Sequence, residues 1–217
     1  MAKRKQPATQ ADQEEHIPPP RRSKLNQSQQ RAWELMQEYP VVCLVGPAGT
    51  GKSHCAIEHA ATAVRQRKYE KIVFVRSPVE MGRSRLGFIP GEVKDKMAPY
   101  MAPLLAIAKK FGVKPDEIEC YPTGFVQGMT FEKSIVIVDE VQNLDIEEFR
   151  AIVTRLGIGS QMILAGDPAQ DTRRIGSFSL FLDRMQSCKS VGIQYFSESD
   201  NMRNPVIIEV LKALEGA

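Results

Sequence analysis

The chain has 217 residues and a net charge of +3 at pH 7, a length that suits one ordinary α/β domain with a single buried core. No apolar run approaches the roughly 20 residues that a membrane-spanning helix needs, so we expect no membrane association. The basic N-terminus has no apolar stretch behind it, which excludes the pattern of a secretory signal.

The first segment, residues 1–23, is polar, contains three consecutive prolines and is predicted to be a disordered tail. Residues 1–24 hold six basic and three acidic side chains, so the remainder of the chain is neutral. Bulk charge therefore gives no argument that the core binds nucleic acid. The tail is either a solvated leader, which we favour, or an arm that touches nucleic acid. We assign the folded domain to residues 24–217.

After the tail, residues 25–29 precede an amphipathic stretch that ends at Tyr39. A glutamine amide in this segment could read the donor and acceptor edge of adenine. A helix-capping role for Asn26 or Ser28 explains the same pattern equally well.

The next segment is the most informative in the chain, because residues 46–53 match the phosphate-binding loop pattern G-x-x-x-x-G-K-[ST] at every fixed position. The apolar run 41–45 predicts a strand that leads into the loop, and residues 53–65 predict a helix that leads out. Glycines let such a loop aim its N–H groups at phosphate oxygens. Lys52 would reach the β- and γ-phosphates of a nucleotide, and the Ser53 hydroxyl would hold Mg²⁺. The predicted nucleotide-binding residues of this segment are Gly46, Pro47, Ala48, Gly49, Thr50, Gly51, Lys52, Ser53 and His54.

A strand is predicted at residues 71–75, followed by an arginine-containing loop at residues 76–85. Such a loop at a strand tip could contact the backbone of a single nucleic-acid strand through salt-sensitive electrostatic contacts. A solvated loop is an equally good interpretation of the same residues. A helical region at 91–111 and a short strand at 118–121 complete this part of the chain.

A second motif lies at the end of the apolar run 134–138, which predicts a buried parallel strand. The run ends in Asp139 and Glu140, at the carboxyl edge of the sheet where α/β proteins bind ligands. Asp139 would hold the magnesium shell, and Glu140 would be the general base that polarises the attacking water. An adjacent glutamate favours hydrolysis over transfer of phosphate to another acceptor.

The rest of the chain continues the alternation of strands and helices. We expect helices at 146–156, 177–186 and 205–214, and strands at 161–165 and 191–196. Just past the first of these strands, Gln170 could sense the γ-phosphate or orient water, or it could cap the next helix. The alternation predicts an α/β fold with a mostly parallel sheet covered by helices on both faces.

The four cysteines are widely spaced and form no C-x-x-C pair and no zinc pattern with the histidines. They are interpreted as reduced core thiols of a cytoplasmic protein.

Taken in order, these segments resemble superfamily-one helicases, and more closely the PhoH family of ATPases. The resemblance begins near residue 23 and extends to the end of the chain. The chain as a whole is similar to a minimal ATPase form of that family. The run 76–103 carries its most specific part. The segments shared with the helicases are residues 25–29, the phosphate-binding loop, 138–142 and 166–170, and those shared with the PhoH family are 86–91, 94–100, 154–157, 166–167 and 200–205.

The resemblance implies a single RecA-like P-loop NTPase domain with specific roles for further residues. Gln29 would contact adenine, Gln142 and Gln170 would couple the γ-phosphate to motion, and Arg203 would act as an arginine finger. Helicases of this type complete their site with a second such domain. The resemblance therefore implies a homo-oligomer, as a ring such as a hexamer, in which a neighbouring subunit supplies the missing face. The candidates for action across that interface are Arg155, Arg173 and Arg174.

The function expected from motif and resemblance together is a Mg²⁺-dependent ATP hydrolase that binds or remodels single-stranded RNA or DNA. One alternative is a nucleotide-gated switch that binds a protein partner, because both would share the same site. A nucleotide or small-molecule kinase is a further alternative, against which Glu140 and Gln170 argue.

Overall fold

The computed structural model describes residues 24–77, 93–171 and 177–202, and residues 206, 210 and 213. The predicted tail and most of the predicted arginine loop therefore lie outside the described residues, as do Arg173, Arg174 and Arg203. The described residues 206, 210 and 213 of the last predicted helix are helical.

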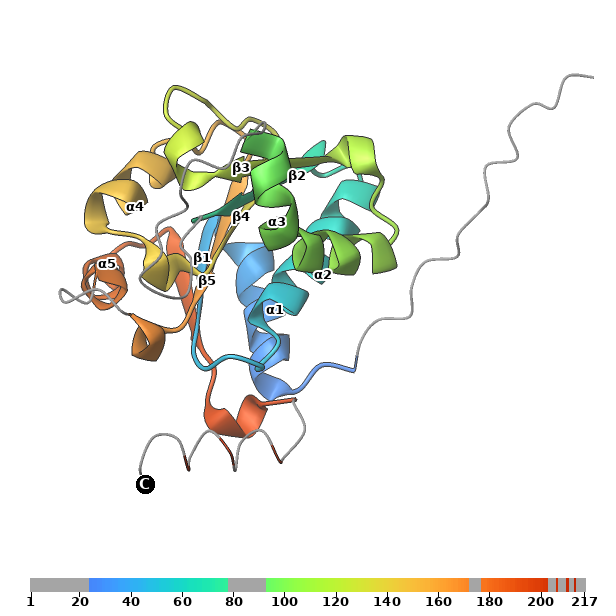
Figure 1. Cartoon of the computed structure of the whole chain (residues 1–217). Helices are drawn as coiled ribbons and strands as arrows, with labels where there is room; N and C mark the ends of the chain where they lie inside the picture. The colour runs from blue at the N-terminus through green and yellow to red at the C-terminus, as the bar shows by residue number, and fades with distance from the viewer. Residues whose placement is uncertain are drawn as a thin grey trace, which may run out of the picture.

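The described strands form a single six-stranded sheet in the order β3-β2-β4-β5-β1-β6 (Figure 1). Every pair of neighbouring strands in this sheet is parallel. The carboxyl ends of the strands therefore meet at one edge, which is where ligands bind in open α/β sheets. The strands are β1 Val41–Val45, β2 Lys71–Arg76, β3 Ile118–Pro122, β4 Ser134–Asp139, β5 Gln161–Gly166 and β6 Val191–Tyr195.

Helices cover both faces of the sheet (Figure 1). Successive side chains of a strand point to opposite faces, so Val42 and Leu44 face one helical layer and Cys43 and Val45 face the other. The first layer contains α1 Gln27–Glu38, α2 Lys52–Arg65 and α3 Val93–Lys110, and the second contains α4 Ile146–Val153 and α5 Ser177–Met185. This arrangement confirms the predicted α/β fold.

Short 3₁₀ helices connect several of these elements. They are η1 Pro115–Glu117, η2 Thr123–Phe125, η3 Val141–Asn143, η4 Pro168–Gln170 and η5 Glu198–Asp200. Two of them, η3 and η4, directly follow β4 and β5, so they turn the chain at the edge where the functional residues are expected.

One helix is shorter than the sequence suggests, because α4 ends at Val153 rather than at residue 156. The chain turns there to pair with residue 131: Gly157 donates its N–H to the Phe131 carbonyl oxygen at 2.8 Å. A Cβ atom at position 157 would lie 2.6 Å from that oxygen, so the close approach requires glycine.

Two cysteines are core thiols, as predicted: Cys43 in β1 and Cys55 in α2 are buried, and burial raises the pKa of each to about 12. Cys188 is exposed, so the interpretation as a core thiol is wrong for that residue. Across the part of the chain that the structure describes, no helix is long and apolar enough to span a membrane.

Candidate nucleotide-binding site

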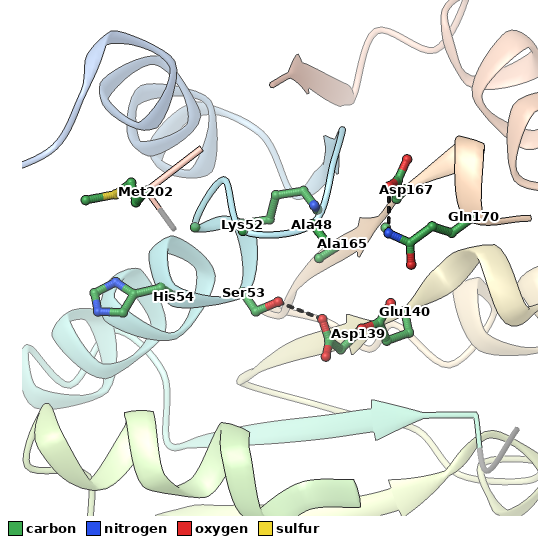
Figure 2. A pocket seen from close by; sticks show the side chains of 13 residues that line it. Ala48, Lys52, Ser53, His54, Asp139, Glu140, Ala165, Asp167, Gln170 and Met202 are labelled. Carbon is green, nitrogen blue, oxygen red and sulfur yellow. Dashed lines mark hydrogen bonds between the residues drawn. The ribbon is translucent and has the colours of Figure 1, made fainter. Parts of the chain in front are cut away.

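A cavity of about 350 Å³ lies at the carboxyl ends of the central strands (Figure 2). Its walls come from the β1–α2 loop, the start of α2, the ends of β4 and β5, η4 and a residue near the C-terminus. Its lining residues are Ala48, Gly49, Gly51, Lys52, Ser53, His54, Asp139, Glu140, Ala165, Gly166, Asp167, Gln170 and Met202.

The loop between β1 and α2 owes its shape to glycine. Gly46, Gly49 and Gly51 have φ angles of 145°, 87° and 86°, a region that side-chain-bearing residues rarely adopt. Space matters as well, since a Cβ atom at Gly46 would lie 2.4 Å from the Phe196 carbonyl oxygen. The motif glycines are therefore required by the fold of this loop as well as by any ligand.

Residues 196–202, which we call the C-terminal strap, run from the end of β6 along the loop. The strap is held at two points: Phe196, its first residue, donates its N–H to the Val45 carbonyl at 2.7 Å, and Asp200 accepts from the Ser28 hydroxyl at 2.9 Å. Donors from the strap and from α1 hold three successive carbonyl oxygens of the loop. These bonds are Asn201 Nδ2 to Ala48 O at 3.3 Å, Met202 N to Gly49 O at 3.1 Å, and Gln29 Nε2 to Thr50 O at 3.1 Å.

Fixing these carbonyl oxygens also fixes the direction of the amides. In a trans peptide the C=O and the following N–H point in opposite directions. The N–H groups of Gly49, Thr50 and Gly51 therefore point away from the strap and α1 donors. A nest of backbone N–H groups held this way at the start of α2 is suited to bind an anion.

Lys52, the first residue of α2, is buried and folds back over the loop. Its Nζ donates to the carbonyl oxygens of Gly46 at 2.7 Å and Pro47 at 2.8 Å. The ammonium group thus lies on the wall of the cavity, within reach of a ligand that enters the loop (Figure 2).

The Ser53 hydroxyl donates to Asp139 Oδ1 at 2.7 Å, which joins the loop motif to the acidic motif (Figure 2). Asp139 is buried, and this burial, together with the neighbouring Glu140 carboxylate, raises the pKa of Asp139. The Ser53 hydrogen bond and the Arg76 guanidinium oppose this rise.

This donor set fits Mg²⁺, which prefers oxygen ligands and is usually bound by one or two carboxylates together with substrate phosphates. Ser53 and Asp139 supply a hydroxyl and a carboxylate oxygen on the cavity wall. In the described residues no three His, Cys, Asp or Glu side chains gather as a metal cage, and a site completed by phosphates needs none.

Glu140 follows β4 with a left-handed backbone, at φ 55° and ψ 45°. Both oxygens of its carboxylate have a partner: Oε2 accepts from Gln142 Nε2 at 2.6 Å, and Oε1 lies 3.5 Å from Arg76 Nη2. The Glu140 side chain is 39 % exposed, so the carboxylate remains open to solvent at the cavity.

The amides of Gln142 and Gln170 meet at Asp167, which lies just after β5. Gln142 Oε1 accepts the Asp167 N–H at 3.1 Å, and Gln170 Nε2 donates to Asp167 Oδ2 at 2.8 Å. A chain of hydrogen bonds therefore runs from Glu140 through Gln142 and Asp167 to Gln170.

Two residues named from the sequence, Gln29 and Arg155, do not belong to the cavity lining. Gln29 is buried and does not line the cavity; its Oε1 accepts the Asn26 N–H at 3.1 Å in a capping box. The capping interpretation of this segment is therefore confirmed for Asn26, and contact of Gln29 with adenine stays a prediction. Arg155 donates to the backbone carbonyls of Ala151 and Met129, at 3.1 and 3.2 Å.

His54 lines the cavity, with its ring edge-on to Phe111 at a centroid distance of 5.2 Å. Arg203 lies outside the described residues, but Met202, directly before it, is bonded to the loop at Gly49.

Three residues of the site could not be assigned from the sequence: Arg76, Asp167 and Met202. Arg76 is the last residue of β2 and is paired in register with Asp139 of β4. Its guanidinium faces the acidic pair. The sequence shows that one strand ends in an arginine and another in an aspartate. It does not show that the two strands are neighbours, which the strand order establishes.

Comparison with known proteins supports one family. The family profile described as PhoH-like protein matches residues 23–215. A PhoH-like protein of Bacillus subtilis (strain 168) is 31 % identical over 191 residues, covering 83 % of this chain and 60 % of that protein. Protein PhoH of Escherichia coli (strain K12) is 29 % identical over 201 residues, covering 87 % of this chain and 56 % of that protein. The chain thus spans somewhat over half the length of these relatives.

Solved structures share the fold at low identity. The large terminase of a thermophilic bacteriophage, in crystal form 3, superimposes with a TM-score of 0.61 at 13 % identity, covering 86 % of this chain and 48 % of that chain. Its complex with ATP-gamma-S superimposes with a TM-score of 0.58 at 12 % identity, with the same coverage. This likeness shows the fold alone.

Proposed function

Because the chain belongs to the PhoH-like family, we propose that it is a Mg²⁺-dependent ATP hydrolase that couples turnover to single-stranded RNA or DNA. We assign the ATPase domain to residues 24–217 and place the protein in the cytoplasm.

The observation that carries the proposal is the hydrogen bond between Ser53 and Asp139, beside Glu140. It brings the end of the phosphate-binding loop to the acidic strand end, although the two segments are 86 positions apart. The Ser53 hydroxyl, the Asp139 carboxylate, the loop amides and the Glu140 carboxylate then line one cavity, and this supports phosphoryl transfer to water, which uses groups of these kinds.

Each residue of the candidate site would have a distinct role in this reaction. The loop amides and Lys52 would hold the phosphates, with the Lys52 ammonium turning from the loop carbonyls to the β- and γ-phosphate oxygens. Glu140 would accept a proton from the attacking water as general base. Mg²⁺, held by Ser53 and Asp139, would neutralise charge that builds on the phosphate oxygens.

The hydrogen-bonded chain beside the cavity supports a sensing role for the two glutamines. Gln170 lines the cavity and would contact the γ-phosphate, and Gln142 would pass a change at Asp167 to Glu140. Arg203 would supply the positive charge that stabilises the transferring phosphoryl group, a contribution worth orders of magnitude in rate in related chemistry.

The experiment that tests the proposal is ATP hydrolysis with and without short single-stranded RNA and DNA, with Glu140→Gln as the blank. Stimulation by one strand type would support a nucleic-acid-coupled enzyme and identify its substrate. Hydrolysis without stimulation, and without strand binding at low salt, would favour a nucleotide-gated switch for a protein partner. Equal turnover by Glu140→Gln and the unaltered protein would refute the base assignment.

We further propose that the active form is a ring of identical subunits, in which a neighbour completes the site. Arg155, Arg173 and Arg174 are the candidates for action across that interface. Size measurement in the presence of Mg²⁺ and ATP tests this, and a monomer at concentrations where hydrolysis is maximal would contradict it.

A further inference from the structure

Arg76 connects the acidic pair to the helical layer next to it. Its Nη1 donates to the Tyr100 carbonyl oxygen of α3 at 3.0 Å and lies 3.5 Å from Asp139 Oδ2. Its Nη2 lies 3.5 Å from Glu140 Oε1. The contact with α3 has the length of a good hydrogen bond. The two contacts with carboxylates are longer than the 2.7–2.9 Å of strong charge-assisted bonds, so they are the ones that exchange easily.

The arginine is placed behind the acids rather than in the cavity. It does not belong to the cavity lining, whereas Asp139 and Glu140 do. Its side chain is 21 % exposed, so part of it is accessible to solvent. A ligand can therefore contact the exposed part of Arg76, which does not belong to the cavity lining.

Glu140 is restrained by this arrangement. One carboxylate oxygen accepts a hydrogen bond from Gln142, and the other faces Arg76. A general base must present an oxygen lone pair to the water that it activates, at hydrogen-bond distance. Loss of the Arg76 contact would free Oε1 for that purpose and leave Gln142 to orient the carboxylate.

We propose that Arg76 is a positioning residue that restrains Glu140, and that the phosphate backbone of a bound single strand releases Glu140 by contacting Arg76. A guanidinium presents a fork of donors that matches a phosphate as well as a carboxylate, so a phosphate can take the place of a carboxylate partner. The inference rests on the proposed role of Glu140 as general base. It adds a physical route by which strand binding raises the rate of hydrolysis.

The test measures kcat and KM for ATP, with and without a short single-stranded RNA or DNA, in Arg76→Ala and in Arg184→Ala. Arg184 is an exposed arginine of α5 and serves as the matched control. Arg76→Ala should raise the strand-free kcat at least about threefold, a small part of the range over which general bases act. It should leave KM for ATP nearly unchanged and abolish stimulation by the strand, while Arg184→Ala behaves like the unaltered protein.

Arg76→Lys keeps the charge but lacks the fork that spans Tyr100 and the acids, so it should show partial release and weaker stimulation. This variant also keeps the proposal testable if Arg76→Ala folds poorly. A strand-free kcat that falls or stays unchanged in both variants would overturn the restraint. Full stimulation in either variant would overturn release by the strand.

Glu140→Gln separates this inference from the proposed function. If that variant is inactive and Arg76→Ala is merely slower, the hydrolase stands and the restraint falls. If Glu140→Gln turns over normally, the proposed role of Glu140 falls, and the inference falls with it.

Discussion

The Ser53 hydroxyl lies 2.7 Å from Asp139 Oδ1, although the strands that lead to the two residues are not neighbours in the sheet. β5 lies between β1 and β4. Because β5 lies between them, the phosphate-binding loop and the acidic pair are set apart at the edge of the sheet, and the cavity lies between them. Asp167 and Gln170, which follow β5, are thereby placed between the two motifs.

Replacement of Lys52 by alanine should weaken ATP binding at least about tenfold, because a hydrogen bond to a charged group contributes about 1.5–3 kcal/mol. Titration with a fluorescent ATP analogue measures this directly. Lys189→Ala removes an exposed lysine just before β6 and is the matched control. Equal affinity of the two variants would contradict a role for Lys52 in phosphate binding.

Glu140→Gln should bind ATP with nearly unchanged affinity and lose about 10²- to 10⁴-fold in kcat, the usual contribution of a general base. The amide retains the size of the carboxylate but cannot accept the proton. Single-turnover measurements separate binding from chemistry. Glu38→Gln, at an exposed position near the end of α1, should leave both unchanged.

Gly46→Ala should destabilise the fold itself by about 2 kcal/mol or more, the range of overpacked core substitutions. The added Cβ would lie 2.4 Å from the Phe196 carbonyl oxygen, on a backbone with φ 145°. Urea unfolding provides the free energy of unfolding. Gly124→Ala is the control, because a Cβ there meets nothing within 4 Å. Similar unfolding midpoints for both variants would show that the loop relaxes.

Acid should destabilise the protein through His59. Burial lowers the pKa of His59 to about 4 from 6.5, while its hydrogen bond to Gln161 raises it. Between pH 6.5 and about pH 4, His59 is therefore protonated in the unfolded chain but not in the folded chain. The free energy of unfolding consequently decreases as the pH drops through this range. The full contribution is about 3 kcal/mol.

Urea unfolding at about pH 7 and about pH 4.5 measures this loss. His59→Gln keeps a donor for Gln161 and removes the titration, so its loss of stability between the two pH values should be smaller. His54→Gln, at a more exposed histidine, should keep the full loss. An unchanged pH dependence in His59→Gln would assign the effect to other groups.

The strands, their helices and the cluster of Lys52, Ser53, Asp139 and Glu140 could be anticipated from the sequence, because each depends on local pattern. Strand ends of a parallel sheet share one edge, so two motifs at strand ends are expected to meet. The neighbours across the sheet could not be anticipated. Arg76 contacts the acids only because β2 pairs with β4, and a helical crossover between parallel strands leaves their order open.

The contacts of residues with several possible partners also could not be predicted from the sequence. Gln29 has one amide that can cap a helix, hold a loop or read a base, and spacing along the chain does not distinguish these. In the fold its Oε1 caps α1 and its Nε2 holds the loop at Thr50. The helix-capping role had a local signal in Asn26, whereas the bond to Thr50 depends on how α1 packs beside the loop.

The C-terminal strap has a consequence for the thermodynamics of ligand binding. Its donors order the loop during folding, so a nucleotide meets amides that already have their final direction and need not freeze a mobile loop. The unfavourable entropy of ordering the loop is therefore part of the free energy of folding and is not part of the free energy of nucleotide binding. In a protein truncated before Phe196, the loop would have to be ordered when the nucleotide binds. Calorimetry would then measure a more unfavourable binding entropy, although the phosphate-binding motif is complete.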